Sequence, residues 1–382
     1  MTSRKPRIAI IGAGMGGLTA AAVLRRYGFE VRIYEQARKF ARIGAGIQQS
    51  ANAIRVLRAI GIEQRLRSAA FQPASWTNRE WDSGKMKYEL PLGAAFESRY
   101  GAPYLLLHRG DLHAALASVV PPENIRMGRQ LVGLDQTATG MALRFADGSV
   151  EDSDAVIGAD GVHSKVRELL LGPEEPRFTG RVAYRTTFPA SLLAGAQIDD
   201  CAKWWGPDRH IVIYYVTPNR DEVYFVTSLP EPQWRNESWS AKGDLGQLRS
   251  AFAGFHPQVQ MVLNACPDVH KWALYERDPL PSWRQGRVVL LGDACHPMMP
   301  YMAQGAANAM EDAAILGRCL DAAGAGGIED AFARYEATRK ERTSRIQLTS
   351  RRNEWMSTRT DPDWVYGYDA WSEPLAMAGP ET

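Results

Sequence analysis

Three glycines near the start of the chain have the spacing of a phosphate-binding turn. Gly12, Gly14 and Gly17 form the pattern G-x-G-x-x-G between a buried apolar run and an alanine-rich stretch. In such a turn the first glycine permits the bend, the second lets the backbone approach a pyrophosphate, and the third lets helix and strand pack closely. The positive end of the following helix then favours the phosphate charge. Met15, inside the pattern, is expected to line the same site.

A carboxylate follows this turn at a suitable distance. Glu35 ends the next predicted strand, 18 residues after Gly17, and Gln36 stands beside it. A carboxylate at this place accepts hydrogen bonds from ribose hydroxyls. A glycine triplet alone would fit a simple tight turn, but strand, helix and acid together predict dinucleotide binding. NAD and FAD share this pattern, so the choice between them stays open at this point.

Two later strand ends carry further polar residues. The run "DAVIGAD" ends in Asp160, and the run "GRVVLLGDA" contains Asp293. In a doubly wound sheet, ligands bind beyond the carboxyl ends of the strands, so three strand ends are expected to converge on one extended cofactor. The loop "MMPYMAQG" leads into a helix near Gln304, whose N-terminus favours negative charge. This loop and helix supply the cofactor-binding candidates Pro300, Gly305 and Ala306.

His210 and Tyr214 are the candidates for catalysis. In the run "HIVIYY", strand alternation puts both side chains on one face. A histidine, with an ordinary pKa of about 6.5, suits removal of a hydroxyl proton from a substrate at neutral pH, and a nearby tyrosine suits orientation or proton relay. The alternative for His210 is a hydrogen-bonded sheet histidine without a catalytic role. Cys201, in the preceding segment, is more simply a small buried residue.

The elements that must position these residues change in type along the chain. The opening run predicts a strand, a helix ending near Gly28 and a second strand, and "DAVIGAD" and "GRVVLLGDA" predict further buried strands. Between those two, from about residue 181 to 230, aromatic and β-branched runs predict an antiparallel sheet. A helical tail is expected from Gln304 to about Ser357. The expected fold is therefore α/β, a Rossmann-type domain with an inserted antiparallel-sheet domain and a C-terminal helical tail.

The same reasoning divides the chain into two domains. The cofactor-binding domain is expected to be discontinuous and to comprise residues 1–72, 101–178 and 275–382. The substrate-binding domain is expected to comprise residues 73–100 and 179–274.

Composition limits the classes of partner. The 382 residues include 45 Lys and Arg against 43 Asp and Glu, and a formal net charge of +2 does not indicate a nucleic-acid binder. The four cysteines form no CxxC pair and the histidines have no metal-ligand spacing, so no metal is expected. The apolar run at the start is short and glycine-containing, so we expect no membrane partner and a cytoplasmic protein, either a monomer or a homodimer.

The three ordered motifs resemble the signatures of a known family. The glycine pattern, "GADGVHSKVR" and "GDACHPMMPYMAQGAANAMEDA" are similar to those of single-component FAD-dependent aromatic hydroxylases of the salicylate and p-hydroxybenzoate hydroxylase type. The resemblance spans nearly the whole chain. It implies a p-hydroxybenzoate hydroxylase-like fold, FAD as cofactor, NADH or NADPH and O2 as co-substrates, and a small aromatic acid as substrate.

The resemblance also implies roles for single residues. By it, Glu35 binds the adenosine ribose, Arg109 of "LHRGDL" lies along the cofactor, Asp160 belongs to the second signature, and Asp293 contacts the ribityl chain. A surface ion pair with Asp111 is the alternative for Arg109.

Within this family, "CAKWWGPDRHIVIYY" and "DPDWVYGYD" are most similar to the hydroxylases of 6-hydroxynicotinate. This similarity implies decarboxylating hydroxylation to 2,5-dihydroxypyridine. The chain departs from that pattern at Gln48 and Tyr301, where those enzymes carry histidine, and both residues are substrate-binding candidates. Acids such as 6-hydroxypicolinate or salicylate therefore remain alternative substrates. An NAD-dependent dehydrogenase and a non-catalytic flavin-binding protein are the alternatives from other classes.

Overall fold

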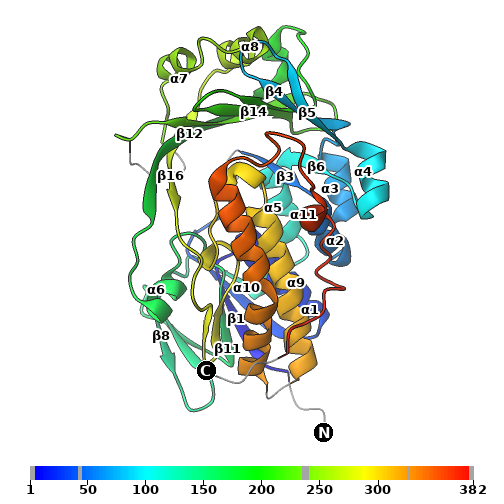
Figure 1. The fold of residues 1–382 in the computed structure, drawn as a ribbon. Coiled ribbons are helices and arrows are strands. Elements are labelled where there is room, and N and C mark those ends of the chain that lie inside the picture. The colour runs from blue at the N-terminus through cyan, green and yellow to red at the C-terminus, as the bar shows by residue number, and fades with distance from the viewer. Residues whose placement is uncertain (1–4, 42–44, 235–240, 325–326, 378–382) are drawn as a thin grey trace.

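The computed structural model describes residues 5–41, 45–234, 241–324 and 327–377. Two large sheets organise it: one surrounds β1 (Arg7–Ile11) in the lower half of Figure 1, and the other surrounds β14 (His210–Tyr215) at the top. In this view the long helices stand beside the lower sheet, and their upper ends reach towards the upper sheet. The arrangement confirms the expected α/β fold with a second sheet inserted into a Rossmann-type unit.

The lower sheet is parallel except at one edge, where a short strand pairs antiparallel. Its central strands are almost wholly buried apolar runs, as expected for a sheet covered on both faces. The three strand ends predicted to converge belong to neighbouring or next-but-one strands, so they do lie at one edge. The order is β17 (Arg284–Gln285), β18 (Val288–Leu290), β11 (Ala155–Gly158), β1, β2 (Glu30–Glu35) and β7 (Ile125–Met127).

The upper sheet has seven strands and is mostly antiparallel, as expected. One neighbouring pair, β13 and β4, runs parallel, because these two strands are joined by a long connection rather than by a hairpin. The order is β16 (His270–Glu276), β12 (Arg177–Pro189), β15 (Glu222–Pro230), β14, β13 (Cys201–Trp205), β4 (Ser75–Glu80) and β5 (Met86–Pro91). The exact domain boundaries stay a prediction.

The C-terminal region consists of two long helices, α9 (Gly305–Ala323) and α10 (Ile328–Arg352), which pack side by side (Figure 1). The helical tail predicted from Gln304 to about Ser357 is present, as two helices rather than one. The first helix stops at Gly324, whose φ of 67° leaves the helical region, and the second stops at Asn353, whose φ is 52°. Asn353 is thereby carried to the end of α10 nearest the upper sheet.

The remaining elements fill the space around the two sheets. Small sheets are formed by β3 (Gly46–Gln49) with β6 (Leu105–His108), and by β8 (Leu131–Gln136), β9 (Met141–Phe145) and β10 (Val150–Ser153). The other α-helices are α1 (Met15–Arg26), α2 (Ala51–Ala59), α3 (Glu63–Ala69), α4 (Gly93–Tyr100), α5 (Arg109–Ala117), α6 (Lys165–Leu171), α7 (Leu245–Ala251), α8 (Pro257–Ala265) and α11 (Asp363–Tyr366). Among the described residues, no helix combines the length and apolar character needed to cross a bilayer.

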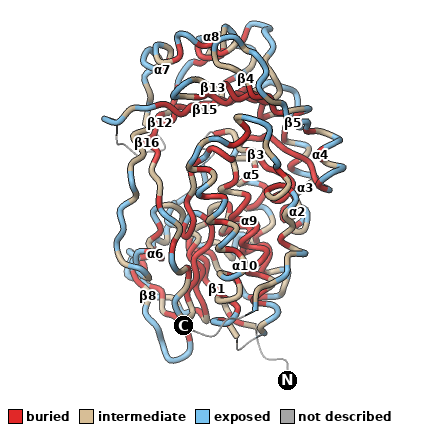
Figure 2. The backbone as a smooth tube through the Cα atoms, in the orientation of Figure 1, coloured by how far each residue is buried: buried red, intermediate tan, exposed pale blue. Residues whose placement is uncertain are grey.

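Burial is concentrated in the strands of both sheets and in α9 (Figure 2). All six residues of β14 are buried, so both faces of the upper sheet are covered. Helices α7 and α8 lie on its outer face, where the Trp204 ring stacks on His256 at the start of α8. Alternation along β13 therefore turns Lys203 toward the inner face, which looks down on the lower half of the molecule.

Candidate functional site

The glycine turn connects β1 directly to α1. Gly12 has a φ of 99°, which a residue with a side chain rarely adopts. A Cβ added at Gly17 would lie 2.0 Å from the Gly12 carbonyl oxygen, so only glycine lets the helix start this close to the strand. Within the described ranges, no side chain caps the N-terminus of α1. Its first backbone N–H groups are thus available to an anion.

Glu35, at the end of β2, is hydrogen-bonded to this turn. Its Oε2 accepts a hydrogen bond from the Ala13 N–H and its Oε1 accepts one from the Ala37 N–H, each at 2.8 Å. An ionised carboxylate has further lone pairs, so both oxygens remain able to accept from a ribose. A cavity of about 520 Å³ opens here. Its lining includes Gly12, Gly14, Glu35, Gln36 and Asp160.

The side chain of Asp160 has a local structural task. Its Oδ1 accepts from the Ser164 hydroxyl at 2.5 Å, and its Oδ2 accepts from the Lys165 N–H at 2.7 Å, so the carboxylate caps α6. Burial raises the pKa of Asp160. Its predicted cofactor contact stays a prediction, and the structure adds that the carboxylate orders the loop that borders the cavity.

A second cavity, of about 360 Å³, reaches from the glycine turn to the inner face of the upper sheet. It shares Gly14, Ala159 and Gly161 with the first cavity, so the two cavities adjoin at the glycine turn. It brings together most of the predicted site residues. They are Met15, Gln48, Arg109, His210, Tyr214, Asp293, Pro300, Tyr301, Gly305 and Ala306.

The residues that line these two adjoining cavities have the chemistry needed to hold an FAD. A Cβ added at Gly14 would meet no protein atom within 4 Å, so the backbone there faces open space. Asp293 is exposed into the cavity although protein surrounds it. Burial raises its pKa, and the charges of His296 and Arg109 oppose that rise. Among the described residues, no side chain caps the N-terminus of α9 either, so two uncapped helix N-termini border this cavity.

The variant Gly14→Ala tests the predicted phosphate-binding turn. The φ of −75° at this position suits alanine, so the apoprotein is expected to unfold at the wild-type temperature. The new methyl group projects into the space where a pyrophosphate would approach the backbone, so FAD affinity should fall by about tenfold or more. Fluorescence titration of the apoprotein with FAD measures this change. Gly17→Ala is the matched contrast, since it should impair folding itself; unchanged FAD affinity in Gly14→Ala would place the cofactor elsewhere.

The inner face of the upper sheet forms the far wall of the cavity. Residue pairing aligns Lys203, Val212, Val226 and Arg185 in one row across four strands. Two apolar side chains thus lie between two cations, about 14 Å apart by three strand spacings. Tyr214 is flanked by Tyr224 on one side of this row, and His210 is flanked by Ser228 on the other. The wall suits a flat aromatic ring that carries polar groups at its edges.

His210 is buried and held on two sides. Its Nδ1 lies 3.3 Å from the Nδ2 of Asn353, and the Tyr301 ring meets the imidazole edge-on at 5.4 Å between centroids. The Tyr301 hydroxyl bonds the Ser228 hydroxyl at 2.9 Å. Burial, and then the charge of Lys203, lowers the pKa of His210 well below its ordinary value. The imidazole is therefore neutral at neutral pH.

Gln48 and Tyr214 form the other edge of the wall. Gln48 accepts a hydrogen bond from the Tyr104 hydroxyl at 2.6 Å, and its side chain also bonds the Tyr214 side chain. Burial raises the pKa of Tyr214 well above its ordinary value, and this bond only partly opposes it. Tyr214 is therefore a protonated hydroxyl, able to orient a ligand or pass on a proton.

Three residues escaped the sequence reasoning: Lys203 and Arg185 on this wall, and Asn353, which contacts Lys203 and His210. Lys203 could have been found, because it is the one charged residue within the apolar and aromatic run "CAKWW". Alternation puts it on the same face of the strand as Cys201. Arg185 could have been found in the same way within "RVAYRTTF". For Asn353 we find no signal, since only the packing of α10 brings it to Lys203 and His210.

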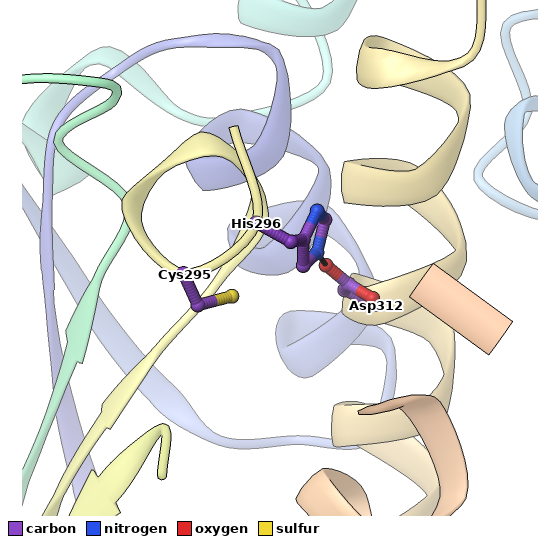
Figure 3. A group of neighbouring side chains, drawn as sticks. All are labelled: Cys295, His296 and Asp312. Atoms are coloured by element: carbon purple, nitrogen blue, oxygen red, sulfur yellow. Dashed lines mark hydrogen bonds and ion pairs between the residues drawn. The ribbon is translucent and has the colours of Figure 1, made fainter. Parts of the chain in front are cut away.

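Cys295 and His296, in the loop that follows β18, lie close to Asp312 of α9 (Figure 3). One ligand-type atom from each lies within 4.8 Å of the others. However, the Asp312 oxygens are already bonded, one to His296 Nε2 at 2.5 Å and the other to Arg339 Nε at 2.7 Å. Gly292 N–H donates to the first of them at 3.1 Å. The cluster therefore anchors the loop to α9, and the expectation of no metal stays a prediction.

Known proteins resemble the chain over nearly its whole length. A model of the FAD binding domain family matches residues 5–350. The chain is 50% identical to the 6-hydroxynicotinate 3-monooxygenase of Bordetella bronchiseptica over 97% of both chains, and 47% identical to that of Pseudomonas fluorescens over 98% of this chain and 97% of the relative. A salicylate hydroxylase solved as a substrate complex is similar with a TM-score of 0.82 at 25% identity, over 97% and 98% of the two chains. The chain therefore belongs to the FAD binding domain family and is an FAD-dependent aromatic monooxygenase.

Proposed function

We propose that the chain hydroxylates a hydroxypyridine carboxylate, with 6-hydroxynicotinate as the first candidate and 2,5-dihydroxypyridine as the product after loss of the carboxylate. The relatives that are about half identical act, by name, on 6-hydroxynicotinate. The observation that carries the proposal is the single cavity that extends from the glycine turn to His210 and Tyr214.

Several residues are proposed to hold FAD along this cavity. The glycine turn and the N-terminus of α1 would receive the pyrophosphate, Glu35 the adenosine ribose, and Asp293 the ribityl chain. Arg109 and the start of α9 would lie beside the ring system. When bound, FAD accepts a hydride from NADH or NADPH and activates O2 for insertion of one oxygen atom into the substrate.

The polar residues of the upper sheet are proposed to control the substrate hydroxyl. A deprotonated ring hydroxyl makes the ring more nucleophilic, and His210 was predicted to remove that proton. The hydrogen bond with Asn353 favours a related role, in which the neutral imidazole donates from Nε2 to the substrate oxyanion. Tyr214 would orient the ring, and Val212 and Val226 would exclude water.

A salicylate-type or 6-hydroxypicolinate-type acid is the second candidate substrate. Tyr301 and Gln48, at the positions where the resemblance expects histidines, are bonded to Ser228 and Tyr104 in this structure. The two side chains are thus held in place by protein partners, so the groups they present to a ligand differ from the expected imidazoles. This difference can move the preferred position of the substrate carboxylate.

We also propose a cytoplasmic location, because the reaction consumes NADH or NADPH and needs a compartment that regenerates them. The monomer or homodimer expectation stays a prediction.

Stimulation of NADH or NADPH oxidation by the substrate tests the proposed function. 6-Hydroxynicotinate should accelerate NADH or NADPH oxidation by the holoenzyme by about tenfold or more, because productive binding places the ring beside the cofactor. The assay should include 6-hydroxypicolinate and salicylate, with chromatographic identification of the product and measurement of CO2. Faster turnover with one of these other acids would transfer the assignment to the second candidate. No stimulation by any of the three would contradict the proposed substrate class.

A further inference from the structure

Lys203 is a buried lysine with no acidic partner among the residues that the structure describes. It is 1% exposed and lies in the middle of β13, on the wall of the substrate cavity. Within the described part of the chain, no carboxylate forms an ion pair with it, and burial alone lowers the pKa of its ammonium group well below the ordinary value. Lysine is rarely buried without a partner because desolvation of the charge is costly.

The groups around the Lys203 amine can offset a positive charge only weakly. Nζ lies 3.7 Å from the centre of the Trp205 ring and 5.9 Å from that of Tyr301. Among the described residues, its hydrogen-bond partner is Asn353, to whose Oδ1 it donates at 3.3 Å. An ammonium group has three donors, so this geometry leaves donors for a ligand in the cavity.

The other cation of the row, Arg185, lies on the opposite side of the cavity. It stacks on Trp272 at 4.4 Å, and burial lowers its pKa only to about 10, so it keeps its charge. The charge of Arg109 also acts on it, as it does on Asp293. Arg185 therefore belongs to the side of the proposed cofactor, whereas Lys203 lies beside His210.

We propose that Lys203 is the receptor for the carboxylate of the aromatic substrate, held in place by Asn353. This inference rests on the proposed function for the substrate class, and it adds the residue that selects acids over neutral rings. A carboxylate at Nζ would supply the missing counter-charge within a desolvated site, where such pairs discriminate strongly.

The same contacts couple this receptor to His210. Lys203 Nζ donates to Asn353 Oδ1, so the Nδ2 group of the same amide is the one that faces His210. Asn353 Nδ2 then donates to His210 Nδ1, which leaves the proton of the neutral imidazole on Nε2. Binding of an anion at Lys203 and the hydrogen-bonding state of His210 are thus linked through one amide.

A binding comparison with paired ligands tests the proposal. Oxidised holoenzyme is titrated, with flavin absorbance as the readout, using 6-hydroxynicotinate against 2-hydroxypyridine and salicylate against phenol. In each pair the second ligand lacks only the carboxylate. For at least one pair, the wild-type protein should bind the acid about 30-fold more tightly or better. In Lys203→Met this preference should fall to about threefold or less, while binding of the neutral ring changes little.

Arg185→Met is the matched control, because it removes the cation at the other end of the same row. It should keep the preference for the acid. Loss of the preference in Arg185→Met with its retention in Lys203→Met would overturn the proposal, and so would a wild-type protein that shows no preference in either pair. If only salicylate binds and stimulates turnover, the proposed pyridine substrate fails while the role of Lys203 is still tested by the salicylate pair.

Two further measurements separate a receptor from a structural lysine. Lys203→Met should unfold at a temperature equal to or above that of the wild type, because methionine is apolar and removes a buried charge. Asn353→Asp tolerates the same backbone conformation and supplies Lys203 with an internal carboxylate, so it should also lose the preference for acids. A lower unfolding temperature in Lys203→Met together with an unchanged preference would assign Lys203 to packing alone.

Discussion

His210→Ala is expected to slow hydroxylation of the substrate by about a hundredfold or more, within the usual range for loss of a group that handles a proton in the transition state. FAD content should stay normal, because His210 lies on the upper sheet, away from the glycine turn. Stopped-flow measurement of product formation, with FAD content from absorbance, checks both expectations. Wild-type turnover in this variant would return His210 to the role of a sheet histidine.

Amide replacements of His210 distinguish its two possible roles. Glutamine places an N–H group near the position of Nε2, so His210→Gln should keep part of the activity if the imidazole acts as a donor. An amide cannot accept the hydroxyl proton, so His210→Gln should be as slow as His210→Ala if the imidazole acts as a base. Tyr214→Phe is the companion variant: a smaller loss, with more hydrogen peroxide released per NAD(P)H, is expected if its hydroxyl orients the ring.

Arg339→Met is expected to lower the free energy of unfolding by about 3–5 kcal/mol at pH 7, because it leaves two buried carboxylates without a shared cation. Arg339 bridges Glu311 and Asp312 at 2.7 Å, and all three side chains are fully buried. Burial raises the pKa of both acids, but neighbouring cations outweigh it: Arg342 and Arg339 hold the pKa of Glu311 low, and His296 and Arg339 that of Asp312. FAD retention should weaken too, since Asp312 anchors the loop after β18.

The pH dependence of this loss has a definite sign. In the wild type the lowered pKa values add stability above the ordinary carboxylate range, and this contribution is lost as pH falls through the folded values. In Arg339→Met the buried acids take up protons more readily, so the deficit should shrink between pH 7 and pH 5. Urea denaturation at both pH values measures it. Lys340→Met, on the exposed side of α10, is the control and should change stability by less than about 1 kcal/mol.

Much of the cofactor site could be predicted from local sequence. A glycine pattern works because its geometry is set by neighbouring residues: Gly12 needs its φ, and Gly17 needs contact with Gly12. The predicted residues of the three motifs line the two adjoining cavities, except for Gly17, which packs helix against strand. The strand β2 ends at Glu35, as predicted, for the same local reason.

The substrate wall was less accessible to sequence reasoning. Alternation correctly grouped His210 with Tyr214, but every residue of β14 is buried, so hydrophobic pattern could not tell the cavity face from the face under α7 and α8. Without that distinction, the sequence could not show that the Lys203 side chain faces the cavity.

The sequence by itself determined the family, the fold class, the cofactor and the glycine turn, because these depend on short segments whose geometry is local. Only the tertiary structure decided which side chains meet at the substrate. Asn353 contacts His210 and Lys203 across more than a hundred residues of chain, because α10 ends in a left-handed residue directly against the upper sheet. Such contacts depend on how separate elements pack, and packing is set by the summed burial of many side chains rather than by any one motif.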